Sequence, residues 1–135
     1  MAFTGNYTCN SFKSGLIDGD FDFDTDTFKI ALYTNSATLN ADTSAYTTTG
    51  EVSASGYTAG GNTLTVSQGI TSSTAFISFT DTSWSSALTA RGALIYKDGG
   101  AAVCVLDFGS DKTSTTTFTV DFPTASSTDA LIRLS

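Results

Sequence analysis

Five aspartates lie within nine consecutive residues, the run DGDFDFDTD at positions 18–26. Carboxylate oxygens are the ligands that Ca²⁺ prefers, and the calcium loop of the EF-hand arranges them as D-x-[DN]-x-[DN]-G-x₅-E. A loop that starts at Asp18 has Phe23 where this pattern requires glycine. Loops that start at Asp20 or Asp22 have threonine there. The run therefore does not match an EF-hand loop in any register.

A straight strand through the same residues has a different geometry. Alternate aspartates would project from one face about 6.6 Å apart, which forms a row of like charges and not a cage with ligands at about 2.3–2.6 Å. A calcium site outside the EF-hand class remains an alternative if the backbone folds back here. Its candidate ligands would be Asp18, Asp20, Asp22, Asp24 and Asp26. We favour a charged rim that faces solvent or selects a basic partner, without a bound metal or cofactor.

The phenylalanines around this run predict a change of direction in the chain. Phe21 and Phe23 are odd-numbered, whereas the bulky apolar residues at 28, 30 and 32 are even-numbered. Side chains alternate along a strand, so one continuous strand cannot bury both sets on the same face. We therefore predict a bulge or turn at residues 24–26, with Phe21 and Phe23 anchoring the segment to the core.

The chain lacks the residues on which the commonest catalytic sites depend. There is no histidine and there are only two cysteines, which excludes imidazole-based triads, histidine zinc sites and four-thiolate sites. The glycine loop that cradles phosphate and the nucleophile elbow are both missing. Carboxylate pairs at glycosidase spacing would arise by chance among thirteen acidic residues. We predict that the protein is not an enzyme.

Aromatic residues are the other candidates for binding. Trp84 and Tyr57 could form a platform for a sugar ring, although a single tryptophan in a small β-domain more often lies in the core or an interface. Phe3 and Tyr7 belong to an N-terminal segment, residues 2–10, that we expect to contact a partner. Tyr46 belongs to a long Thr- and Ser-rich loop, residues 35–50, of which we expect the same. The predicted interface residues are Phe3, Tyr7, Tyr46, Tyr57 and Trp84.

The composition is that of one folded β-domain over residues 1–135. Hydrophobic residues make up 40 % of the chain and charged residues 14 %, with abundant Thr, Ser, Val, Phe and Tyr. The net charge of −7 and the scattered basic residues argue against nucleic-acid binding. No apolar run reaches the ~20 residues that span a bilayer, and the N-terminus lacks a secretory pattern. We therefore expect folding in a cytoplasm, with Cys9 and Cys104 as free thiols.

Hydrophobic periodicity predicts the elements that would position these residues. Strands are expected at 27–34, 62–68, 75–79, 116–123 and 129–134. Two more strands should form a hairpin around Asp98-Gly99-Gly100, and a short helix capped by Asn10 is predicted at 10–18. The predicted fold is an all-β, single-domain β-sandwich of immunoglobulin-like or jelly-roll type with seven or eight strands.

Several of these runs together resemble a known family. TFKIALYTNSATL, GEVSASGYTAGGNTLTV, SSALTARGALIYKDG and AVCVLDFGSDK, between a CNSFKSGLIDG start and a DALIRL end, are similar to small virion-associated proteins of tailed bacteriophages. The resemblance implies a structural protein that folds in the host cytoplasm and becomes part of the virion. Its implied partner is the major capsid protein or another virion protein. No functional residue can be transferred, because none of these runs is a catalytic or ligand motif.

Two functions follow as hypotheses. The first is a capsid decoration, or cement, protein that stabilises the shell by spanning neighbouring capsid subunits. The alternative is a tail- or fibre-associated module that recognises a host-surface carbohydrate, with calcium as a conceivable aid. Both allow a homo-oligomer, and a trimer is the form expected by analogy with threefold positions on a capsid.

Overall fold

The computed structural model describes residues 3–135, and β-strands form most of its regular structure. In chain order the elements are β1 (Tyr7–Thr8), α1 (Asn10–Asp18), β2 (Phe28–Tyr33), β3 (Asn62–Leu64), β4 (Val66–Thr71), β5 (Thr74–Phe79), β6 (Thr82–Trp84), β7 (Thr89–Lys97), β8 (Ala102–Thr113), β9 (Phe118–Val120) and β10 (Ile132–Leu134). All pairs between these strands are antiparallel. The predicted all-β class is confirmed.

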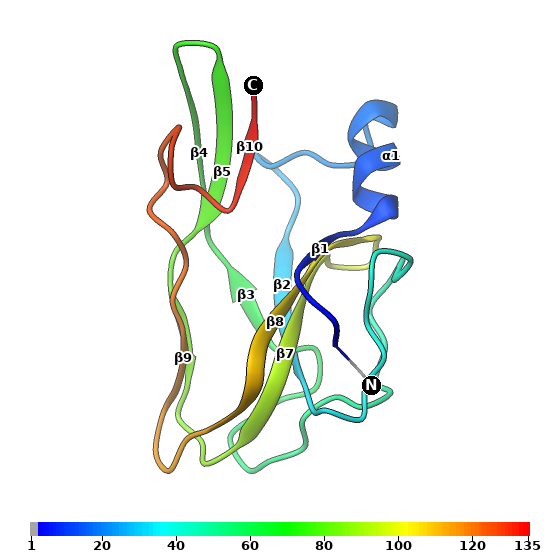
Figure 1. Ribbon diagram of the computed structural model, residues 1–135, viewed down its shortest axis with the longest axis vertical. Coiled ribbons are helices and arrows are strands. Elements are labelled where there is room, and N and C mark those ends of the chain that lie inside the picture. The colour runs from blue at the N-terminus through cyan, green and yellow to red at the C-terminus, as the bar shows by residue number, and fades with distance from the viewer. Residues whose placement is uncertain (1–2) are drawn as a thin grey trace.

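The strands form three sheets of unequal size (Figure 1). The main sheet has the order β1-β8-β7-β2-β3, the second has the order β10-β5-β4, and β6 pairs with β9 in the third. The predicted hairpin joins β7 to β8 through Asp98, Gly99 and Gly100, and Gly99 has a φ of +74°. Positive φ is the conformation that a tight hairpin turn demands and that glycine tolerates.

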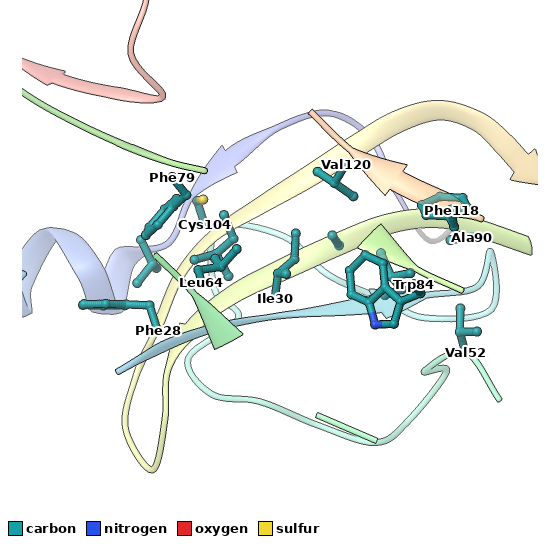
Figure 2. Packing of buried hydrophobic residues seen from close by; sticks show 14 of the residues in the cluster. Phe28, Ile30, Val52, Leu64, Phe79, Trp84, Ala90, Cys104, Phe118 and Val120 are labelled. Carbon is teal, nitrogen blue, oxygen red and sulfur yellow. The ribbon is translucent and has the colours of Figure 1, made fainter. Parts of the chain in front are cut away.

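Both faces of the main sheet are covered. On one face Phe28, Ile30 and Leu32 pack with residues of β6 and β9, which form a second layer over the sheet. Figure 2 shows Phe28 and Phe79 at one end of this core and Trp84 with Phe118 at the other. The opposite face forms a second core whose members include Tyr33, Leu39 and Leu94. Burial on both faces explains why the predicted strand at 27–34 is almost continuously apolar.

The long segment 35–50 supplies the cover for the second face. Ala37 and Leu39 are almost completely buried, and Ala45 forms a β-bridge with Ala101. The Thr34 amide donates a hydrogen bond to the Gly50 carbonyl at 2.8 Å, which closes the segment at its base. The expectation that this segment extends toward a partner is wrong for Ala37 and Leu39, because their side chains are buried in the second core.

The described residues contain ten strands where seven or eight were predicted. The additional ones are β1 and β6, which have only two and three residues, and the predicted strand at 62–68 divides into β3 and β4. Such short strands are set by their pairing partners and show no periodicity of their own.

The predicted helix is confirmed over Asn10–Asp18, but its N-cap is Cys9 and not Asn10. No side chain caps this end; instead the Phe12 amide donates to the Cys9 carbonyl at 3.0 Å. Gly15 faces the core: a Cβ there would lie 2.5 Å from the Phe21 ring. Glycine has a low helix propensity, but at position 15 the missing side chain leaves room for the Phe21 ring to pack against the helix.

Candidate functional site

The aspartate run begins at the end of α1 and closes into a turn over residues 22–26, which we call the acidic turn. The Asp26 amide donates to the Asp22 carbonyl at 2.9 Å, and the Asp22 amide donates to Asp26 Oδ2 at 2.8 Å. The Asp24 amide donates to Asp22 Oδ1 at 2.9 Å. The predicted turn is confirmed, and two of its carboxylates are used to hold the backbone in place.

Two phenylalanines anchor this turn to the core, as predicted. Phe23 stacks on Phe28 with ring centroids 4.5 Å apart and an interplanar angle of 7°. Phe21 meets Phe12 of the helix edge-on at 5.0 Å. Asp22, between the two phenylalanines, and Asp24, which follows them, are exposed.

The five carboxylates are not brought to a common centre. Asp26 Oδ2 lies 3.1 Å from Lys97 Nζ, and Asp24 Oδ1 accepts a hydrogen bond from Gln68 Nε2. The hydrogen bond from the Asp22 backbone, followed by that from Lys97, lowers the pKa of Asp26. Asp18 and Asp20 are exposed. Within residues 3–135, no three acidic or cysteine side chains lie close enough together to hold a metal ion.

Three of the five predicted interface aromatics are core residues. The exposed fractions of Phe3, Tyr57 and Trp84 are 1 %, 8 % and 3 %. Tyr57 and Trp84 pack against each other with ring centroids 6.0 Å apart, inside the first core. The predicted sugar platform is therefore wrong, since neither ring presents a face to a ligand. Of the other two candidates, Tyr7 and Tyr46 are both half-buried.

The N-terminal segment is part of the main sheet and not a free arm, which corrects its role as a contact segment. Its first residue, Ala2, lies outside the described part of the chain. From Asn6 onward it runs along β8, where the Cys9 amide donates to the Val103 carbonyl at 2.9 Å. Asn6 Oδ1 accepts a hydrogen bond from the Asp107 amide at 2.6 Å. These contacts use the backbone groups that a partner strand would otherwise meet.

Both cysteines are buried free thiols, as predicted. Burial raises the pKa of the Cys9 thiol to about 11, and burial raises that of Cys104 further. A thiol that stays protonated is a poor nucleophile. Cys9, at the start of α1, and Cys104, in β8, therefore contribute to the packing of the two cores and not to chemistry.

A cluster of tyrosines around Glu51 is the most connected polar group in the described chain, and the sequence patterns did not reveal it. Glu51 Oε1 accepts a hydrogen bond from the Tyr46 hydroxyl at 2.6 Å. Its Oε2 accepts from the Tyr57 hydroxyl at 2.7 Å and from the Gly60 amide at 2.8 Å. One carboxylate thus joins the two loops, residues 34–50 and 52–61, that precede and follow Glu51 between β2 and β3. One feature of the sequence could have drawn attention to this residue: Glu51 is the single glutamate of the chain.

The same cluster connects these loops to the main sheet. The Leu32 amide of β2 donates to the Tyr57 hydroxyl at 2.9 Å, and the Tyr96 hydroxyl of β7 donates to the Gly60 carbonyl at 2.7 Å. Tyr46 stacks on Tyr96 with ring centroids 5.0 Å apart. Every polar atom in this arrangement therefore has a structural partner, so we assign the cluster to stability and not to ligand binding.

We expect the tyrosine cluster to make the fold sensitive to alkali. Burial, followed for Tyr46 and Tyr57 by their hydrogen bonds to Glu51, raises the pKa of both hydroxyls; burial raises that of Tyr96 to about 12. A folded-state pKa above the unfolded value of 10 favours folding fully below pH 10 and progressively less above it. The urea midpoint should therefore hold up to pH 10 and fall between pH 10 and about 12.

The variant Tyr96→Phe supplies the control for this experiment. The substitution removes one hydroxyl whose pKa is raised. The urea midpoint of the variant should therefore fall less steeply with pH than that of the natural chain. Equal slopes, or a midpoint that does not change above pH 10, would contradict the assignment.

The sheet formed by β10, β5 and β4 projects beyond the end of the main sheet (Figure 1). Paired residues share a face of a sheet, so the register defines one apolar face. Its cross-strand rows are Val66 with Phe79, then Gln68 with Ile77 and Ile132, then Ile70 with Ala75 and Leu134. Exposure increases outward: Phe79 is buried in the first core, whereas Ile70 is 70 % and Leu134 64 % exposed.

One edge of this projecting sheet has no partner in the described chain. β4 pairs only with β5, so the other side of Val66–Thr71 is unpaired; we call it the β4 edge. No charged residue occurs from residue 52 to residue 80. The acidic turn lies beside this edge, because Asp24 bonds Gln68 and a shallow hollow is lined from both sides by Phe23, Asp24, Val66 and Gln68. The candidate interaction surface consists of the β4 edge and the outermost cross-strand row, which contains the exposed Ile70 and Leu134.

No helix within residues 3–135 has the length and apolar character needed to cross a membrane. The choice between an immunoglobulin-like and a jelly-roll sandwich stays a prediction, as does the virion family suggested by the sequence. Comparison of the chain with known protein families, curated proteins and solved structures finds no match.

Proposed function

We propose that this protein is a non-enzymatic structural protein of a bacteriophage virion, and that it decorates and stabilises the capsid. The observation that carries the binding role is the projecting sheet, with Ile70 and Leu134 exposed beside the unpaired β4 edge. Exposed apolar side chains on an open sheet are typical of surfaces that another protein covers. The assignment to a virion rests on the sequence resemblance to phage proteins.

The other polar clusters described above have their partners within the chain, so they hold the fold together and leave the projecting sheet as the proposed docking surface. Glu51 and its tyrosines hold loops together, and the acidic turn is closed by its own carboxylates. Binding to assembled capsid subunits but not to free ones would shift the equilibrium toward the intact shell. The carbohydrate-binding alternative is not proposed further, because Tyr57 and Trp84 are buried.

The test is to add the purified chain to capsids assembled without it. We expect saturable co-sedimentation, and a higher temperature of shell disruption in capsids that carry the chain. Capsids that neither retain the chain nor gain heat resistance would refute the proposed function. Retention of the chain on immobilised glycans would instead support the tail-associated alternative.

A homo-oligomer is part of this proposal, and the trimer is its expected form. Light scattering coupled to size-exclusion chromatography measures the mass directly, against 14.0 kDa for one chain. A stable monomer at micromolar concentration would count against the trimer.

A further inference from the structure

The β4 edge differs from the other sheet edges of the described chain in length. The strands at the other ends of sheets, β1, β3, β6, β9 and β10, have two or three residues, whereas β4 has six. Proteins usually protect such an edge with lysine, proline, a bulge or a covering segment. β4 reads VSQGIT and contains neither lysine nor proline, and its register with β5 has no bulge.

An unpaired strand of this kind can accept a partner strand. In an antiparallel pair every second residue directs its N–H and C=O away from its neighbour. Half of the six residues of β4 therefore offer main-chain hydrogen bonds on the open side, and a strand added there would extend the sheet to four strands. Main-chain pairing supplies affinity, while the side chains that flank the added strand decide which sequence is accepted.

The two faces of β4 specify those side chains. On the apolar face, Gln68 bonds Asp24 of the acidic turn, and Ile70 is exposed two residues farther along. A side chain of the added strand opposite Gln68 would lie near the Asp24 carboxylate, and one opposite Ile70 would meet an apolar neighbour. On the other face the outer strand presents only Ser67, Gly69 and Thr71.

We propose that the β4 edge binds an extended segment of another protein in which a basic residue and an apolar residue, two positions apart, enclose one small polar residue. The basic residue faces Asp24 and the apolar residue packs against Ile70. A second copy of this chain fits less well, because it would bring its own uncharged strand and acidic turn to a molecule with a net charge of −7. This inference deepens the proposed function and rests on it for the setting in which such a partner is met.

The first experiment uses the full ¹⁵N-labelled chain and a short synthetic probe. The probe is an acetylated, amidated peptide of sequence TKTVTS, and its charge-reversed counterpart is TETVTS. We expect the lysine peptide to shift the amide resonances of residues 66–71, with the glutamate peptide binding about two- to fivefold more weakly, the range of a surface charge pair.

Two pairs of matched variants test the predicted contacts. Ile70→Lys should weaken binding about tenfold by removing the apolar neighbour and placing a lysine on the edge; Ile17→Lys changes an isoleucine on α1 that is 88 % exposed and should have no effect. Asp24→Asn keeps an acceptor for Gln68 but removes the charge, so the preference for lysine over glutamate should disappear. Asp42→Asn alters a carboxylate bonded to Asn10 in the same way and should leave that preference intact.

Three outcomes would overturn the inference. These are shifts that map outside residues 66–71, equal affinity for the two peptides, or a dimer of the chain that Ile70→Lys dissociates, since a second copy would then occupy the edge. Capsid binding separates this failure from that of the proposed function. If Ile70→Lys still binds capsids, the capsid role stands and the β4 edge is not its docking site. If the natural chain binds the peptide but not capsids, the edge is correctly assigned and the virion role is wrong.

Discussion

Gly61→Ala is expected to prevent the chain from folding stably, the largest effect that we predict for a single methyl group. Gly61 has a φ of +77°, and a Cβ built there would lie 1.7 Å from the carbonyl oxygen of Ile30 in β2, which pairs with β7 and β3 in the main sheet. Neither backbone can move away without breaking the pairing of Ile30 with Asn62. The expected cost exceeds about 3 kcal/mol, which is a large part of the stability of a small domain.

Gly99→Ala is the matched control for this prediction. Gly99 has a φ of +74°, but a Cβ there would have no atom within 4 Å. The substitution therefore adds only the strain of a left-handed backbone, about 1–2 kcal/mol. Urea unfolding followed by the fluorescence of Trp84, the single tryptophan of the chain, measures both variants. Similar losses at the two positions would show that backbone strain, and not the lack of space beside Ile30, limits Gly61.

Glu51→Gln is expected to lower the free energy of unfolding by about 2–4 kcal/mol, since hydrogen bonds to a charged group each contribute about 1.5–3 kcal/mol. The carboxylate accepts three hydrogen bonds, from Tyr46, Tyr57 and the Gly60 amide. A glutamine offers one acceptor oxygen, and its NH₂ group would face at least one of these donors. The Tyr57 hydroxyl is buried, so it cannot turn to water for compensation.

Asp42→Asn is the control that distinguishes the effect of disrupting the Glu51 network from the effect of losing one negative charge. Asp42 is exposed and accepts one hydrogen bond from the Asn10 side chain at 2.9 Å, which an asparagine can still accept. Its unfolding free energy should change by no more than about 0.5 kcal/mol. If Glu51→Gln is equally mild, the cluster does not hold the two loops, and the alkaline loss of stability predicted above should be small as well.

The elements that could be predicted from the sequence are those whose local hydrophobic pattern matches the burial of the same residues in the fold. β2 and the β7–β8 hairpin have apolar runs with turn residues between them, and α1 has an apolar position at Phe12 that enters the core. The turn after Phe23 followed from side-chain parity alone, because a strand cannot bury both parities on one side. In each case a few neighbouring residues carry the information.

The candidate site was less predictable because burial depends on residues distant in sequence. Trp84 and Tyr57 look the same in sequence whether they bind a sugar or fill a core, and only the layer formed by β6 and β9 decides between these roles. Glu51 gains its partners from both sides in the chain, without a motif. The β4 edge was not foreseen, since an alternating strand does not reveal whether it has one neighbour or two.

The pairing of β1 with β8 has a consequence for biosynthesis. Thr8 lies opposite Cys104, so the first strand of the chain acquires its neighbour only after nearly a hundred further residues have been added. At the usual synthesis rates of about 5–20 residues per second, that interval is roughly 5–20 s. During this time Phe3 and Cys9 have no core to enter. In a nascent chain Phe3 and Cys9 therefore stay without their full core until β8 has been made, and the pairing of β1 completes the main sheet late in synthesis.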